Sequence, residues 1–264
     1  MPFTLSHPAA VLPLLRRPFG RTALVAGAVA PDMPYFVGVL GLPVGAQSWY
    51  EPFLNATTTH GVPGALTVSL PYALALWLLA RTAHRPLASL LPLPTPAPRP
   101  RTGGATTRRA AWTVLSAVIG IATHLLWDAF THHDGFVVAH TPWLTSPMIG
   151  GLTWARALQH LSTVGGLAAI GVYAWRRRAA LQGGDLGTAR RRALFAVAGV
   201  AVVGAVAHAW WWLAGPQAPG GLSAGEVVEG ALSDAAKGAG AVLIGVLALY
   251  VVAWWGRRAV VRGV

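Results

Sequence analysis

Five side chains that could bind a divalent metal ion are spread through an otherwise strongly apolar chain: His7, Asp32, His60, His124 and Asp128. The segment THLLWDAFTHHDG places Asp128 one helical turn after His124. At this i,i+4 spacing, both side chains lie on one helix face, about 6 Å apart. Imidazole and carboxylate ligands suit zinc or another first-row metal. Ionisable groups inside apolar segments are costly, so the pair predicts a functional metal site.

Each of these side chains also has a purely structural interpretation. Asp128 could orient His124 or join a polar network between helices. Asp32, in AGAVAPDMPYF, could accept backbone N–H groups at a helix break. His60 follows three threonines at a predicted helix start, where a lone histidine is usually an interface residue. His7 lies near the N-terminus, where side chains are usually solvated. These residues alone leave the alternatives open.

Further residues could transfer protons in a hydrolytic reaction. Asp32 or Asp128 could serve as general base, and His132 or His160 could protonate a leaving group. His132 extends the stripe of His124 and Asp128 if the helix continues that far. Gln159 could donate to a substrate. The chain has no G-x-S-x-G elbow, P-loop or dinucleotide motif, so nothing supports serine catalysis.

The composition is that of an integral membrane protein, since 54% of the residues are hydrophobic and 11% are charged. Apolar runs of about 18 or more residues predict membrane-spanning helices. Five such runs occur, at 62–81, 111–130, 156–175, 193–213 and 238–255. A sixth, 22–40, is broken around Pro31 and Asp32. We therefore predict an all-α polytopic bundle of about five full spans plus an N-terminal broken helix or hairpin.

The N-terminal region is predicted to be a helical hairpin. Residues 7–16 and 22–31 would pack antiparallel, with the basic turn between them facing the cytoplasm and both potential ligands meeting at the other end. We treat residues 1–264 as a single membrane domain. Its motif-bearing part is 1–175, a Pro- and Arg-rich cytoplasmic linker occupies 82–110, and two C-terminal spans lie within 193–255.

The net charge of +12 comes from arginines that cluster at the ends of spans. By the positive-inside rule, the loops 82–110 and 176–192 and the C-terminus are cytoplasmic, and 41–61, 131–155 and 214–237 face outward. No aromatic-interleaved basic face occurs, so we expect membrane lipid and not nucleic acid as partner. Cysteine is absent, so a metal must be held by nitrogen and oxygen ligands.

At these residues the chain resembles a known family. The blocks MPFTLSHPAAVLP, AGAVAPDMPYF, TTHGVPG, THLLWDAFTHHDG and ALQHLSTVGG resemble a bacterial multi-pass membrane family classed as a domain of unknown function, over about residues 1–175. The series of His, Pro-Asp, Thr-His and His-x-x-x-Asp is more distantly similar to predicted membrane-bound metal-dependent hydrolases with a ligand set like that of zinc-dependent phospholipase C. The resemblance implies metal ligation by all five residues, and a bacterial cytoplasmic membrane location.

The chain departs from the distant pattern at two places. Those hydrolases commonly have a second Asp after the Pro-Asp pair and a serine after the Thr-His histidine, whereas this chain has Met33, Pro34 and Gly61. These differences argue against a second metal ion.

The function that we expect is metal-dependent hydrolysis of a lipid or another amphiphilic ester or phosphoester, with zinc as the ion and manganese as the alternative. A transporter or ion-handling protein would use the same intramembrane cluster, but it needs a polar path across the membrane. The inner halves of the spans are mostly Ala, Val, Leu and Gly. A structural scaffold, the third class, would bind no metal.

Overall fold

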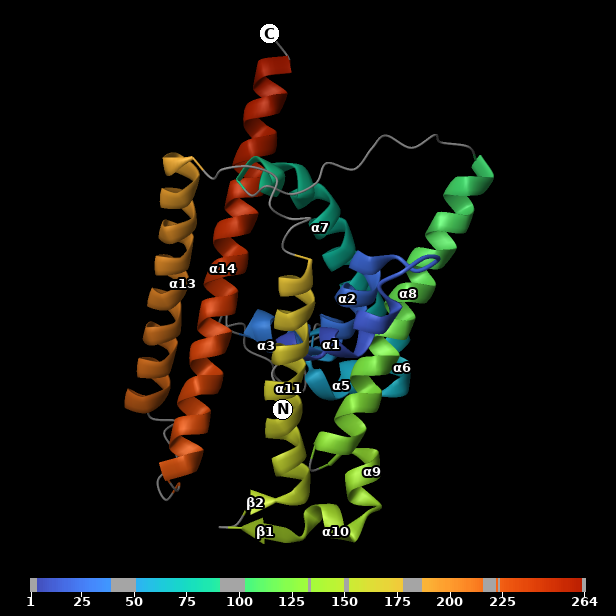
Figure 1. Cartoon of the computed structure of the whole chain (residues 1–264), viewed down its shortest axis with the longest axis vertical. Helices are drawn as coiled ribbons and strands as arrows, with labels where there is room; N and C mark the ends of the chain where they lie inside the picture. Colours follow the sequence, from blue (N-terminus) through green and yellow to red (C-terminus); the bar gives the residue numbers. More distant parts are fainter. Residues whose placement is uncertain are drawn as a thin grey trace. The chain divides into compact units, whose positions relative to one another are not determined.

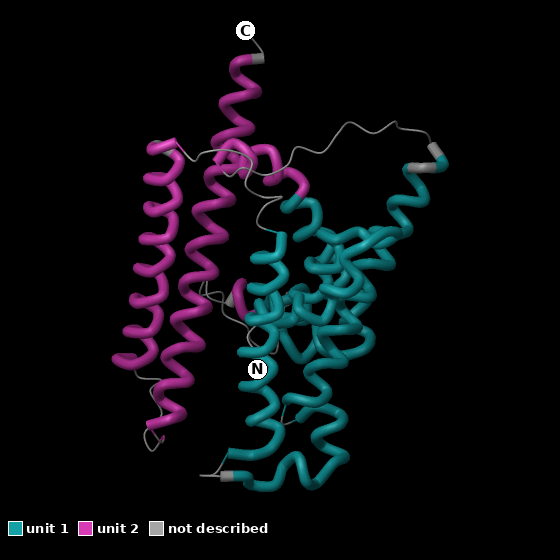
Figure 2. Tube along the Cα trace, viewed as in Figure 1, with its two compact units in different colours: residues 1–34, 44–80, 97–178 teal, residues 35–43, 81–96, 179–264 magenta. Residues whose placement is uncertain are grey.

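The structure, a computed structural model, describes residues 4–38, 51–90, 103–132, 134–149, 152–177, 187–215, 222 and 224–262. Almost all of them are helical, and their only strands are two short ones, which confirms the all-α prediction. Contacts within the chain group it into two compact units (Figure 2), and the single membrane domain stays a prediction. Unit 1 comprises residues 1–34, 44–80 and 97–178, and unit 2 comprises 35–43, 81–96 and 179–264.

Unit 1 begins with short helices and continues into two long ones (Figure 1). Its first elements are η1 (Thr4–Ser6), α1 (Pro8–Val11), η2 (Leu12–Leu14), α2 (Arg21–Val29), η3 (Ala30–Asp32) and the start of α3 (Met33–Gly38). They are followed by α4 (Glu51–Leu54), α5 (Ala56–His60), α6 (Val62–Gly64), the π-helical η4 (Ala65–Ser69) and most of α7 (Leu70–Leu90). The remaining elements are α8 (Gly103–Thr131), α9 (Phe136–Ala139), α10 (Pro142–Thr145), β1 (Pro147–Ile149), β2 (Leu152–Thr153) and α11 (Trp154–Arg176).

The predicted break in the N-terminal helix is confirmed. Pro31 and Pro34 carry no backbone N–H, and regular helix α2 accordingly ends at Val29. The 3₁₀ turn η3 and the short α3 follow, and Asp32 lies in the break. Helices α1 and α2 contact each other, as the predicted hairpin requires, and Val11 is buried with residues of α2.

Helices α2 and α8 cross at closely packed glycines. A Cβ atom on Gly120 would lie 2.3 Å from the carbonyl oxygen of Leu24, and one on Gly27 would lie 2.1 Å from that of Ala117. Only residues without a side chain allow the two backbones to approach this closely. The contact fixes the α8 turn that follows Gly120, which carries His124.

Within the described part of the chain, four helical stretches are long and apolar enough to cross a membrane: Val62–Leu90, Thr106–Ala139, Arg190–Ala214 and Ala224–Val261. They contain four of the five predicted spans. The fifth, 156–175, lies in α11, which is helical over 23 residues but is not among the four. Polar residues in its first half, Gln159, His160, Ser162 and Thr163, make it less apolar.

The ends of the predicted linker 82–110 are helical, because α7 continues to Leu90 and α8 begins at Gly103. The Pro-rich residues 91–102 lie outside the described part of the chain. After α8, the chain forms a small folded segment from α9, α10 and an antiparallel hairpin that pairs Pro147 with Thr153. Val138, Leu144 and Ala155 form its buried core.

Unit 2 is built mainly from α13 (Thr188–Ala214) and α14 (Ala224–Arg262). Gly204 faces Gly238, and Trp212 faces Gly230, so the two helices run antiparallel. A Cβ atom on Gly238 would lie 2.5 Å from the carbonyl oxygen of Gly204, which shows how closely the backbones approach. Most of the large apolar side chains of α13 are exposed, as expected of a helix that faces lipid.

Candidate metal centre

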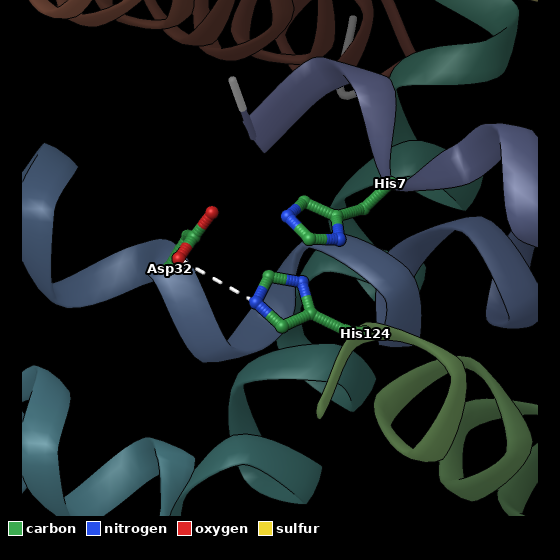
Figure 3. A group of neighbouring side chains, drawn as sticks. All are labelled: His7, Asp32 and His124. Atoms are coloured by element: carbon green, nitrogen blue, oxygen red, sulfur yellow. Dashed lines mark ion pairs between the residues drawn. The ribbon is translucent and has the colours of Figure 1, made fainter. Parts of the chain in front are cut away.

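The structure brings together the five predicted metal ligands, which come from four separate parts of unit 1. His7 directly precedes α1, Asp32 ends η3, His60 ends α5, and His124 and Asp128 lie on α8. All are buried except His60, which is half-buried. Figure 3 shows three of them, His7, Asp32 and His124, facing one another. The i,i+4 pair on α8 therefore faces the interior of unit 1.

His124 lies at the centre of this group. Its Nε2 atom is 3.1 Å from Oδ2 of Asp128, 3.6 Å from Oδ1 of Asp32 and 3.2 Å from Nε2 of His60. The Nε2 atom of His60 is 3.5 Å from Oδ1 of Asp32 and 3.4 Å from Oδ2 of Asp128. Donors about 2.0–2.1 Å from a tetrahedral zinc ion lie roughly 3.4 Å from one another. These side chains are thus spaced as ligands of one ion would be.

His7 joins the group from the other side. Its ring stacks on that of His124 with 3.8 Å between the centroids, and its Nε2 atom is 3.5 Å from Oδ1 of Asp128. Two overlapping sets of three residues have potential ligand atoms that all lie within 4.8 Å of one another. The sets are His7–Asp32–His124 and His60–His124–Asp128. A buried His/Asp group that could hold a metal ion is therefore present.

Several buried polar atoms of this group make no hydrogen bond. This holds, among the described residues, for both carboxylate oxygens of Asp32 and Asp128 and for both ring nitrogens of His7. Burying a polar group without a partner costs free energy, and burying a carboxylate costs more. A bound cation would compensate both carboxylates and accept the histidine lone pairs. The donor set consequently fits a divalent ion.

Backbone carbonyls fix the orientation of two of the imidazoles. His60 Nδ1 is 2.8 Å from the carbonyl oxygen of Ala56, and His124 Nδ1 is 2.8 Å from that of Ala28. A carbonyl oxygen can only accept, so in each ring Nδ1 carries the proton and donates. In the neutral rings, the two Nε2 lone pairs then face each other across 3.2 Å. The backbone carbonyls thus hold each ring in the orientation and tautomer that leave Nε2 able to bind a metal.

His60 lies before the first of the four long helical stretches, and its surroundings change its pKa. Burial disfavours its protonated form, but the carboxylates of Asp128 and Asp32 outweigh this effect and raise the pKa of His60 to about 9. Without a cation, the imidazole of His60 is therefore protonated at neutral pH and compensates part of the carboxylate charge. A metal ion would take over this role.

Of the two predicted proton donors, the structure places His132 beside the group. Its Nε2 atom is buried 3.6 Å from Oδ1 of Asp128, and its Nδ1 atom is 3.8 Å from Oδ1 of the exposed Asp134. His160 lies on an exposed part of α11, and within the described ranges no contact joins it to the group. Its neighbour Gln159 is buried. The proton-transfer role of His160 stays a prediction.

Thr59 is a supporting residue that the sequence did not single out. It is fully buried, and its hydroxyl donates to the carbonyl oxygen of Pro31 at 2.7 Å. Ser69 donates in turn to the carbonyl oxygen of Thr59 at 2.9 Å. These bonds join the residue before Asp32 to the residue before His60. A run of three threonines gives no sign of which one faces inward, although its position next to His60 is a signal.

Comparison with known proteins gives a family and no named activity. No curated protein and no solved structure matches the chain. The more distant resemblance to metal-dependent hydrolases accordingly stays a prediction. The family match extends well beyond the predicted 1–175, since it includes most of α14. Over residues 1–256 the chain matches the family described as a domain of unknown function (DUF4184), and it belongs to that family.

Proposed function

We propose that this protein is a membrane-embedded metal-dependent hydrolase that acts on a lipid or another amphiphilic ester or phosphoester. The observation that carries the proposal is the buried group of three histidines and two aspartates with unsatisfied donor atoms. Groups of this composition inside membrane proteins are expensive, and they mark functional sites. We further propose zinc as the ion, with manganese as the alternative, and the bacterial cytoplasmic membrane as the location.

The residues of the centre would have distinct roles. His7, Asp32, His60, His124 and Asp128 would hold the ion. When bound, such an ion supplies Lewis-acid polarisation of the scissile group and activates water. Asp32 or Asp128 would accept a proton where a carboxylate oxygen is not engaged. His132 is close enough to Asp128 to protonate a leaving group at the same place.

Partial exposure indicates the side from which a substrate would enter. The side chains of His60 and His132 are 20% and 18% exposed, whereas those of His7, Asp32 and His124 are almost completely buried. A substrate that enters past His60 and His132 would approach near Thr131, where the apolar helix α8 ends. A substrate that resides in the membrane could reach this place without leaving the bilayer, which favours an amphiphile.

The first experiment measures metal content. The protein is purified without chelator in lipid nanodiscs, and bound metals are quantified by mass spectrometry for the wild type, Asp128→Asn and Asp134→Asn. Asp134 is an exposed carboxylate close to the centre but outside the ligand set, and it serves as the matched control. We expect about one divalent ion in the wild type and in Asp134→Asn, and a clear loss in Asp128→Asn. A metal-free wild type would refute the proposal.

The second experiment tests hydrolysis. Metal-loaded protein is incubated with vesicles of phosphatidylethanolamine and phosphatidylglycerol and with nitrophenyl esters and phosphoesters, and the products are identified by mass spectrometry. We expect product formation that stops with Asp128→Asn and persists with Asp234→Asn, which alters a carboxylate of α14 that pairs with Lys237. If the loaded wild type hydrolyses none of these compounds while binding metal, the hydrolase proposal is wrong and an ion-handling role takes its place.

A further inference from the structure

The segment that follows α8 has an unusual surface. Residues 134–149 and 152–154 carry α9, α10 and the paired strands β1 and β2, and we call these described residues the outer segment. Its own core of Val138 and Leu144 is buried together with Ala155. Its larger apolar side chains nevertheless point outward: Phe136 is 72% exposed, Trp143 57% and Trp154 42%. The segment is folded and still presents aromatic rings to its surroundings.

The outer segment is attached directly to the metal centre. Gly135 follows the end of α8 closely, and a Cβ atom there would lie 2.6 Å from the carbonyl oxygen of the ligand Asp128. His132 joins the two parts, since it faces Asp128 on one side and Asp134 on the other. Helix α8 ends at Thr131, and Gly135 packs against the backbone of Asp128 and Ala129, so the chain turns back here instead of continuing along the helix axis. The exposed rings thus begin one residue after a direct contact with the backbone of Asp128.

Charge is nearly absent from the outer segment. Asp134 is the one Asp, Glu, Lys or Arg in 134–154, His140 adds one imidazole, and Arg156 follows two residues after the end of the segment. A loop in bulk water has no physical reason to expose Phe136, Trp143 and Trp154 while carrying almost no charge. Tryptophan and other amphipathic aromatic rings instead concentrate at the membrane–water interface, where the ring contacts lipid and the polar edge contacts water.

We infer that the outer segment lies in the headgroup layer of the bilayer that α8 crosses, with Phe136, Trp143 and Trp154 inserted among the lipids. Because the segment continues directly from α8, lipid is favoured over another protein as the partner that covers the exposed rings. Only a few residues separate Thr131 at the end of the apolar helix from Phe136, so the rings begin at the depth where the span leaves the hydrocarbon. The partial openings at His60 and His132 then face lipid headgroups. This inference does not depend on hydrolysis.

The test uses the absence of cysteine in the chain to place one probe at a time. An environment-sensitive fluorophore is attached to Phe136→Cys and to Trp143→Cys in vesicles of phosphatidylcholine and phosphatidylglycerol. Gly104→Cys, at the exposed basic start of α8, is the water reference. Leu126→Cys, 62% exposed on the apolar part of the same helix, is the lipid reference. Size-exclusion profiles and thermal unfolding curves like those of the wild type establish that each variant is folded.

Quenching gives the result. Lipids with a nitroxide near the headgroup should quench the probes at 136 and 143 at least twofold more than the probe at 104, and lipids with a deep nitroxide should quench position 126 most. Aqueous iodide should quench position 104 most. Two outcomes would overturn the inference: iodide quenching at 136 and 143 equal to that at 104, which places the segment in water, or protection from both quenchers, which indicates a second protein surface.

Discussion

Asp128 has more contacts with the histidines of the centre than Asp32 has. Its Oδ2 atom faces His60 and His124, and its Oδ1 atom faces His7 and His132. Among the described histidines, Asp32 lies within 4 Å of the ring nitrogens of only His60 and His124, through one oxygen, and His7 belongs to its wider set within 4.8 Å. The two carboxylates are therefore unequal, although both are buried.

This inequality predicts an order of metal affinities. Asp128→Asn should weaken metal binding more than Asp32→Asn, because it removes the negative charge shared by four histidines instead of two. Competition with a chromophoric chelator measures both dissociation constants. We expect the two variants to differ by at least tenfold. Equal constants, or a stronger effect at Asp32, would mean that the ion lies nearer to His7 and Asp32 than this geometry indicates.

A second prediction concerns Thr59. Thr59→Val keeps the shape of the side chain but removes the hydroxyl. The carbonyl oxygen of Pro31 then loses its hydrogen-bond donor, and the helix break that contains Asp32 is held less firmly. Changes in groups that orient metal ligands typically cost 10–100-fold in affinity. We expect a loss in that range by the same chelator competition. Thr57→Val, at an exposed threonine of the same helix, should bind metal like the wild type.

Contrary results at Thr59 are easy to recognise. Wild-type affinity in Thr59→Val would show that the hydroxyl does not position the ligands. Rescue of affinity in Thr59→Ser, which restores the hydroxyl without the methyl group, distinguishes the loss of this bond from a general loss of packing.

Some residues of the centre could be predicted from local spacing in the sequence, and others could not, because their positions depend on packing between distant segments. The i,i+4 spacing of His124 and Asp128 is local, so helix geometry alone placed them on one face. His7 and His60 depend on packing between elements distant in the chain, and only a resemblance to other sequences indicated them. Thr59 was not predicted at all, because a hydroxyl bond across 28 positions leaves no periodic signal.

At the scale of elements, glycines allow the helices that carry the predicted ligands to pack closely together. Gly120 and Gly27 bring α8 onto α2, whose Ala28 carbonyl orients His124. Gly166 of α11 contacts Ser6, the residue before His7. The break at Pro31 was predictable from proline chemistry, and α2 does end there. The pairing of glycines with particular neighbours was not, since it follows from how the helices cross.

The adjacent residues Gly165 and Gly166 test whether a close glycine contact holds His7 in place. A Cβ atom on Gly166 would lie 2.9 Å from the backbone oxygen of Ser6, whereas one on Gly165 would meet nothing within 4 Å. Gly166→Ala should therefore displace η1 with His7, weaken metal binding and lower thermal stability by about 1–3 kcal/mol, the usual range for overpacking. Gly165→Ala should be neutral or slightly stabilising, because alanine favours helix.

Metal titration and thermal unfolding in detergent measure the two glycine variants side by side. Equal behaviour of both would show that α11 does not hold His7 in place. A loss of stability with unchanged metal affinity would show that η1 moves without carrying His7 with it.

At the scale of the whole molecule, helix length and charge describe how the chain crosses the membrane. Helix α14 has 39 residues and so extends about 58 Å, well beyond a hydrocarbon core of about 30 Å. Its acidic residues Glu226 and Glu229 lie near one end, and Arg257 and Arg258 lie near the other. This asymmetry agrees with the arginine clusters elsewhere in the chain. With 131–155 outside and 176–192 inside, the predicted orientation requires α11 to cross the membrane as well, although α11 is not among the four most apolar stretches.

That orientation is the last prediction. Single cysteines at His140, Gly104 and Gly187 occupy exposed positions in three different connecting regions of a cysteine-free chain. A membrane-impermeant maleimide added to intact cells should label position 140, because 131–155 faces outward, and should label 104 and 187 only after the membrane is permeabilised. Labelling of 104 and 187, but not 140, in intact cells would invert the topology. The metal centre, near the end of α8 that leads to position 140, would then face the cytoplasm.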